Sequence, residues 1–357
     1  MRVLRIAALF WVMGCDPFHV EFDAVENAVS YQAQRARMIP EVPKRLRVMT
    51  WNIKFGGGRI DFFFDCFGDR VLMRSEEVIA NLEGLARKIR QVDPDVLLLQ
   101  EVDVRSKRGA FIDQVQWLLD HTRLSFGVYA SQWRADFVPS DGLGAMDDGN
   151  AILSRWPLTD ATRIALPLRG DQGALTEYFY LRRNLLTAKL ALPSGPRVGI
   201  VVTHSEAYSK DGTKLKHIQR FHAEIEHMAK SSDLVIAGGD LNTIPPGSTQ
   251  TKDFPDSVCT DEDFIADDFS EEQAWLDPLY ADLSSAIPSA DYQADNSAYF
   301  SHTVDGRGFW NRTLDYLFTN KTWDEGSGLV HQSVERGGMD TMPLSDHAPL
   351  SATLELP

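Results

Sequence analysis

The segment Leu234-Val235-Ile236-Ala237-Gly238-Gly239-Asp240-Leu241-Asn242 is an apolar run that ends in two glycines and two polar side chains. Four consecutive apolar residues before such a break are typical of a buried strand. The glycines allow a sharp turn or a close approach of backbone to a ligand. Asp240 and Asn242, two positions apart on extended backbone, would point the same way. The segment alone is also compatible with an ordinary turn.

Other short segments along the chain have the same design, in which an apolar stretch ends at polar groups of a catalytic type. They are Thr50-Trp51-Asn52, Gln100-Glu101, Thr203-His204-Ser205 and Ser345-Asp346-His347, with Leu314-Asp315-Tyr316 just before the last. Strand ends in an α/β sheet bring distant residues into one pocket. Together these groups can hold a divalent metal against a phosphate and deliver water to it.

The order of apolar patterns predicts a layered α/β domain. Strands are expected over residues 46–52, 96–99, 198–202, 234–237, 313–318 and 348–356. A helix is expected from an N-cap at Ser75 to Asp93-Pro94, and a second one over residues 215–230. Residues 163–183 are a candidate basic track, and a strand with partly exposed edges is the simpler alternative.

The chain has 357 residues, 43% of them hydrophobic, and a formal net charge of −15. This length is enough for a large single α/β core. The negative charge argues against general affinity for polyanions, although a local basic groove would still permit a nuclease. After the N-terminal segment, no run has the ~18 apolar residues that a membrane-spanning helix needs.

The N-terminus has the features of an export signal. Arg2 and Arg5 precede a short apolar stretch that ends at Gly14-Cys15. Val12-Met13-Gly14-Cys15 resembles a bacterial lipobox, in which the cysteine is acylated and anchors the mature protein at a membrane. We expect a signal at 1–14, a partly helical tether at 15–45 and a catalytic domain at 46–357. An ordinary signal peptide is the alternative.

Two features leave alternatives open. Cys66 and Cys259 could form a disulfide in an exported protein, but spacing alone cannot show that they meet.

Residues 253–300 contain thirteen acidic residues and no Lys or Arg. We expect this acidic insertion to form long loops with a short helix near residues 271–283. A solvated acidic face is its simplest interpretation, because no EF-hand spacing is present.

Glu101 is the strongest single candidate for a metal ligand. A carboxylate that follows four apolar residues must be paired, protonated or metal-bound. Asn52 and Asp346 supply further hard oxygen atoms, and the chain has no CxxC or HExxH motif, so Mg²⁺ or Mn²⁺ is favoured over zinc. His204 and His347 are candidate donors to phosphate oxygens. A carboxylate such as Asp315 beside His347 would keep that imidazole protonated.

These segments, with Gly149-Asn150-Ala151-Ile152-Leu153-Ser154-Arg155-Trp156-Pro157, resemble the endonuclease/exonuclease/phosphatase superfamily over residues 46–356. The resemblance implies a deoxyribonuclease I-like α/β/β/α sandwich of four layers. It implies Mg²⁺ held by Glu101, with Asn52 and Asp346 nearby. Asp240 would activate the attacking water with help from Asn242, and His204 would contact the phosphate. His347, held by Asp315, would contact the phosphate from the other side or act as the acid–base group.

The resemblance does not identify which phosphoester the protein hydrolyses. We expect a monomeric hydrolase that acts on a compact phosphodiester or phosphomonoester, such as a lipid head group, in a bacterial envelope. A nuclease is the alternative, and it would need a basic track such as Arg169, Tyr178, Phe179, Tyr180, Arg182 and Arg183. An inactive binding scaffold is a lesser alternative, since such proteins usually lose a metal ligand or the Asp240-type residue.

Overall fold

A computed structural model describes residues 18, 20–35, 37–63, 65, 68–256, 268–306 and 308–357. The acylation expected at Cys15 and the Cys66–Cys259 pair fall outside these residues. Within them, no helix is both long enough and apolar enough to cross a bilayer.

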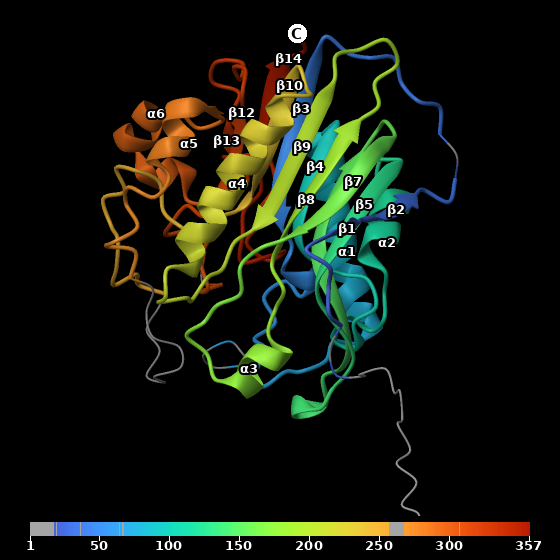
Figure 1. The fold of residues 1–357 in the computed structure, drawn as a ribbon, viewed down its shortest axis with the longest axis vertical. Helices are drawn as coiled ribbons and strands as arrows, with labels where there is room; N and C mark the ends of the chain where they lie inside the picture. Colours follow the sequence, from blue (N-terminus) through green and yellow to red (C-terminus); the bar gives the residue numbers. More distant parts are fainter. Residues whose placement is uncertain are drawn as a thin grey trace, which may run out of the picture.

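Two sheets of seven strands each form the centre of the molecule (Figure 1). The first sheet has the order β1 (Val25–Asn27), β7 (Leu158–Ala165), β8 (Asn184–Leu190), β9 (Val198–His204), β10 (Leu234–Asp240), β12 (Asp315–Thr319) and β11 (Ser284–Ser285). The second has the order β13 (Leu329–Val330), β14 (Leu350–Glu355), β3 (Arg45–Asn52), β4 (Val96–Asp103), β6 (Gly144–Ser154), β5 (Phe126–Val138) and β2 (Val29–Gln32).

Helices cover the outer faces of both sheets and give the four layers expected from the sequence. Helices α1 (Ser75–Val92) and α2 (Gln114–His121) pack on one sheet, and α4 (Thr213–Ala229) and α5 (Asp277–Asp282) pack on the other. The remaining helices are α3 (Ala174–Phe179), which has no buried residue, and α6 (Ser289–Ala294). In β4, Val96 and Leu98 face the other sheet, whereas Leu97 and Leu99 pack with the core under α1 and α2. Strands covered on both faces read as unbroken apolar runs, which is why the sequence revealed them.

The expected helices are confirmed with small changes at their ends. Helix α1 begins at Ser75 itself, with Arg74 as its N-cap, one residue before the predicted cap. The Glu77 carboxylate accepts a hydrogen bond from the Arg74 backbone N–H at 2.8 Å. This contact satisfies a backbone donor in front of the helix and places the negative charge of Glu77 in its first turn. The expected short helix near 271–283 is α5.

The predicted tether is partly built into the domain, and its predicted helix is wrong. Strand β1 pairs with β7 at one sheet edge, and β2 pairs with β5 at an edge of the other sheet. Both strands are short and mostly exposed, so backbone hydrogen bonds to a neighbouring strand stabilise them. Residues 163–183 do not form the single strand considered as an alternative for this segment, because α3 lies within this range.

Packing between the sheets should dominate stability. Leu98 is fully buried between the sheets, whereas the Leu175 side chain on α3 is 76% exposed. We expect Leu98→Ala to lower the free energy of unfolding by about 2–5 kcal/mol because it leaves a cavity. Leu175→Ala, the same chemical change at the surface, should alter it by less than about 0.5 kcal/mol. Urea unfolding followed by tryptophan fluorescence measures both, and equal effects would contradict this packing.

Candidate active site

The predicted polar residues meet where several strands end. Asn52 is the last residue of β3 and pairs in register with Gln100 of β4. Asp240, at the end of β10, pairs with His204 of the parallel strand β9 and with Asp315 of the antiparallel strand β12. Three of these polar residues thus come from neighbouring strands of one sheet, and Asn52 comes from the facing sheet.

The Asn52 side chain joins the two sheets at this point. Its Nδ2 donates to Glu101 Oε1 at 2.9 Å and to Asp240 Oδ2 at 3.1 Å. Its Oδ1 accepts the Lys54 backbone N–H at 3.0 Å. The two carboxylates, 139 positions apart in sequence, therefore share one amide group. As predicted, Glu101 and Asp240 belong to a single site.

Glu101 is placed by an irregularity in its strand. The pairing of β4 with β6 shifts register between Leu99 and Val102, and Glu101 has a φ of +52°. A bulge of this kind re-aims a side chain, and positive φ is unusual for a residue other than glycine. The Glu101 side chain remains 27% exposed, so its carboxylate is accessible from the pocket.

A chain of buried hydrogen bonds orients His347. Its Nδ1 lies 2.8 Å from Asp315 Oδ2, and Ser301 Oγ donates to the same carboxylate oxygen at 2.7 Å. The Asp315–His347 pair predicted from sequence is therefore formed. On the other side, His347 Nε2 is 3.0 Å from His302 Nδ1 and 3.5 Å from Asp240 Oδ2.

Burial and neighbouring charges give the histidines and Asp240 different protonation states. Burial by itself would lower the pKa of His347, but the charges of Asp315 and Asp240 raise that pKa to about 10. Burial lowers the pKa of His302, and the nearby Arg312 charge lowers it further. A protonated His347 thus donates to a neutral His302. Burial raises the pKa of Asp240 to about 7, although the His347 charge opposes this rise.

His204 is a neutral imidazole in this environment. Burial lowers its pKa well below the usual value, and the charges of Arg183 and His347 lower it further. Its Nε2 lies 3.4 Å from Asp240 Oδ2 and 3.9 Å from Glu101 Oε1. A neutral ring carries one N–H, and the carboxylates favour it on Nε2. His204 lines the pocket, as a group that contacts substrate must.

The carboxylates near Glu101 fit a hard cation. Burial raises the pKa of Glu101, and the negative charge of Asp346 raises it further. Two carboxylates that repel each other in this way are stabilised by a shared divalent ion. Burial alone would raise the pKa of Asp346, but Lys54 and His347 hold it below its usual range. Lys54 Nζ is 3.8 Å from Asp346 Oδ2 and 3.2 Å from Asp65 Oδ2.

Asn242 is not on extended backbone, which corrects the local geometry predicted for it. Its φ is +50°, and its backbone N–H donates to Asp240 Oδ1 at 2.9 Å. Its Nδ2 donates to the Ser205 carbonyl at 3.0 Å. The Asp-Leu-Asn sequence forms a turn in which Asn242 fixes the Asp240 carboxylate. From this position Asn242 can still assist Asp240, as the resemblance implies.

A cavity of about 910 Å³ opens beside Glu101 and His204. Its aromatic lining residues are Phe55, Phe63, Trp133, Phe179, Tyr180, Tyr208 and Phe269. Arg183 also lines it and is 7% exposed. The Arg183 Nη1 donates to Gln132 Oε1 at 3.4 Å, and its Nε has no hydrogen-bond partner among the described residues. The charge of this guanidinium on the cavity wall is suited to an anionic substrate.

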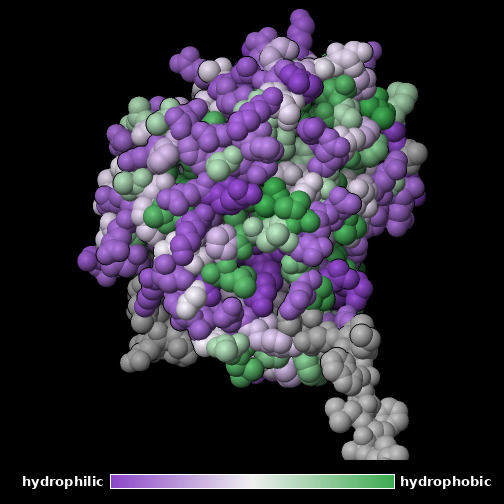
Figure 2. All heavy atoms as spheres, in the orientation of Figure 1, coloured by the Kyte–Doolittle hydropathy of each residue, from purple (hydrophilic) through white to green (hydrophobic). Residues whose placement is uncertain are grey.

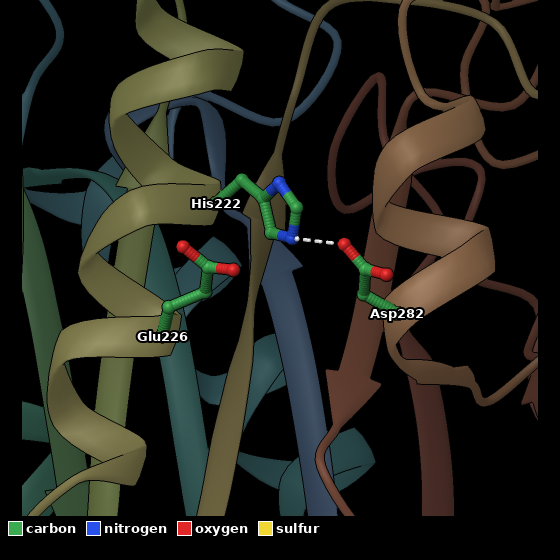
Figure 3. Close-up of side chains that lie close together, drawn as sticks. All are labelled: His222, Glu226 and Asp282. Carbon is green, nitrogen blue, oxygen red and sulfur yellow. Dashed lines mark ion pairs between the residues drawn. The ribbon is translucent and has the colours of Figure 1, made fainter.

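A second group of possible metal ligands lies outside this cavity. His222 and Glu226 are on α4, and Asp282 ends α5 (Figure 3). His222 Nε2 is 3.1 Å from Asp282 Oδ2, an ion pair when the histidine is protonated. Glu226 and Asp282 are exposed. This group links two helices and shares no residue with the active site.

Sequence reasoning missed two residues of the site. His302 follows no apolar run, so a single histidine there gave no signal. Lys54 lies two residues after Asn52 in a short 3-10 helix, and only its position after a strand end marked it. The structure assigns both residues to the site, because His302 contacts His347 and Lys54 lies near Asp346.

The Asp315–His347 contact makes a prediction about protonation. In Asp315→Asn, the pKa of His347 should fall from about 10 by about one to three pH units, because an adjacent negative charge is removed. Titration of the imidazole signals by NMR measures this change. Asp282→Asn, which removes a remote carboxylate, should leave the His347 pKa unchanged. An unaltered pKa in Asp315→Asn would show that Asp315 does not hold this histidine.

Comparisons with known proteins agree with this geometry. The sequence model of the Endonuclease/Exonuclease/phosphatase family matches residues 49–347. No curated protein sequence matches the chain. Among solved structures, an endonuclease/exonuclease/phosphatase from Beutenbergia cavernae DSM 12333 is similar with a TM-score of 0.55 and 20% identity, covering 88% of this chain and 72% of its own.

Two further structures share the fold at lower identity. A family protein from Leptotrichia buccalis C-1013-b has a TM-score of 0.51 at 15% identity, with 87% of this chain and 100% of that chain covered. TDP2 from D. rerio, complexed with a single-strand DNA product, has a TM-score of 0.51 at 16% identity, with 87% of this chain and 99% of that chain covered. The chain therefore belongs to the endonuclease/exonuclease/phosphatase family, whose members hydrolyse phosphoester bonds with a divalent metal.

Proposed function

We propose that this protein is a Mg²⁺-dependent hydrolase of compact phosphodiesters or phosphomonoesters. The observation that carries this proposal is the Asn52 amide, which holds Glu101 and Asp240 together beside the cavity. Glu101 and Asp346, with Asn52 next to them, would hold the ion; Mn²⁺ has the same preference for oxygen ligands. When bound, the ion neutralises charge on the phosphate oxygens.

The protein's own side chains divide the remaining work. Asp240, whose pKa is raised to about 7, is suited to accept a proton from the attacking water. Asn242 holds that carboxylate through its backbone N–H. Asp315 keeps His347 protonated, and the positive charge of this ring lies beside Asp240 and favours negative charge developing near it, while its two N–H groups stay on Asp315 and His302. His204 lines the cavity, and its N–H is suited to donate to a phosphate oxygen.

The cavity favours a compact substrate over a nucleic acid strand. The basic track that a nuclease would use is interrupted, because the Arg182 guanidinium donates to the backbone carbonyls of Glu177 and Tyr180. Arg169 is paired with Asp171 at 2.8 Å. Asp268 of the acidic segment lines the cavity, where its negative charge disfavours a long polyanion, and Glu272 offsets the charge of Lys214 at 2.8 Å.

We also propose that the protein is exported and anchored by acylation of Cys15. The basic start, the short apolar stretch and the Gly14-Cys15 pair support this location. An enzyme held at a membrane surface meets substrates in or near the lipid.

Hydrolysis of bis-p-nitrophenyl phosphate with Mg²⁺ tests the proposed chemistry. Glu101→Gln and Asp240→Asn should each lower kcat/KM by about 10²–10⁴-fold, because one weakens metal binding and the other removes the proton acceptor. EDTA should abolish turnover by the wild type. Glu226→Gln, a matched change in the second ligand group, should keep full activity.

Two outcomes would contradict this proposal. Equal rates for the wild type and both site variants, or no hydrolysis by any of them, would favour an inactive scaffold. A parallel panel with supercoiled DNA, RNA, sphingomyelin and phosphatidylinositol phosphates identifies the substrate class. Faster cleavage of plasmid DNA than of every compact ester would favour the nuclease alternative.

A further inference from the structure

Exposed hydrophobic side chains lie on or next to segments that line the active-site cavity. Leu175 on α3 is 76% exposed, Tyr208 is 67% exposed, Phe137 near the end of β5 is 51% exposed, and Leu168 is 42% exposed. We call these four residues the apolar rim. Apolar side chains gathered at one place on a surface usually mark a binding site.

The rim is continuous with the cavity. Thr176 and Phe179 of α3 line the cavity, whereas Leu175 of the same helix is not among its lining residues. Tyr208 lines the cavity and belongs to the rim, and its carbonyl accepts a hydrogen bond from Arg169 Nη2 at 3.1 Å. In Figure 1, α3 projects from the lower end of the molecule. Figure 2 shows hydrophobic side chains at the same end.

The first described residue of the chain lies on this surface. The Phe18 ring packs against Phe137 at a centroid distance of 6.5 Å and against Phe179 at 6.3 Å. Cys15 precedes Phe18 by three positions. Three residues span at most about 11 Å when fully extended. An acyl group at Cys15 would therefore enter a membrane close to the rim.

We infer that the apolar rim inserts into the surface of a lipid bilayer, and that the cavity receives its phosphoester from that bilayer. This inference rests on the proposed hydrolase function. A protein seated on the rim would cover the mouth of the cavity and block its substrate. A bilayer does not block it, because the surface that binds the rim is also the source of the substrate.

The chemistry of the cavity and its surroundings agrees with a lipid. Aromatic walls accept acyl and glycerol groups, while Arg183 places a positive charge on the cavity wall, where it favours a phosphate. Exposed charges near the rim have both signs, with Lys210 and Arg134 beside Asp136 and Asp211 in the sequence. Such a mixture fits zwitterionic head groups and gives no strong preference for anionic lipid. Phosphatidylcholine is therefore the bilayer of choice for a test.

Vesicle binding without turnover tests the inference. The full chain carrying Cys15→Ser, so that acylation there cannot contribute, is sedimented with phosphatidylcholine vesicles in EDTA. The bound fraction gives a partition coefficient for each protein. Leu175→Gln and Phe137→Gln, each in this background, should lower this partition coefficient at least tenfold. Val29→Gln is the matched control. Val29 is 54% exposed on β2 and pairs with Tyr129, eight residues before Phe137 on β5.

The outcomes separate this inference from the proposed chemistry. Hydrolysis of soluble bis-p-nitrophenyl phosphate should be the same within twofold for all four proteins, because these substitutions lie outside the cavity. Hydrolysis of vesicle phospholipid should fall at least tenfold in the rim variants alone. Failure of the parent chain to bind vesicles, or equal binding by rim and control variants, would overturn the inference while leaving the soluble activity intact. Vesicle binding without hydrolysis of either substrate would overturn the proposed function, but the apolar rim would still be a membrane-binding surface.

Discussion

The hydrogen bonds from one amide to two carboxylates, one of them buried, are the constraint on which this site depends. The Asn52 side chain, at the end of a strand in one sheet, donates to Glu101 of its own sheet and to Asp240 of the facing sheet. Asp240 is 1% exposed, and a buried carboxylate destabilises a fold unless donors or a cation surround it. The sandwich must therefore keep its two sheets in register at this end for the carboxylates to be satisfied.

The same end of the sandwich combines two kinds of surface. Lys54 and Asp346 are charged groups close to each other near Glu101, and the cavity beside Glu101 has both aromatic and charged walls. His302 and Asp315 hold His347. A phosphoester with an apolar substituent matches this combination, since its phosphate and its organic part need opposite surroundings.

The sequence predicted the parts of the molecule whose patterns are set by burial. Strands β4 and β10 are covered on both sides, so their apolar runs and terminal carboxylates stood out. Helix α1 was evident from its apolar spacing. By contrast, β1 and β2 are exposed edge strands whose hydrogen bonds come from distant partners, and no local pattern marked them. Asn242 was misjudged because its φ of +50° follows from contacts to Asp240 and Ser205.

The most direct test of the central claim is a crystal structure of the protein with Mn²⁺, with the ion located by its anomalous scattering. The account predicts one strong peak in the cavity, about 2.2 Å from a Glu101 carboxylate oxygen and adjacent to Asp346. Asp240 should stay within hydrogen-bond distance of Asn52. A peak found only at His222, Glu226 and Asp282, with none beside Glu101, would contradict it.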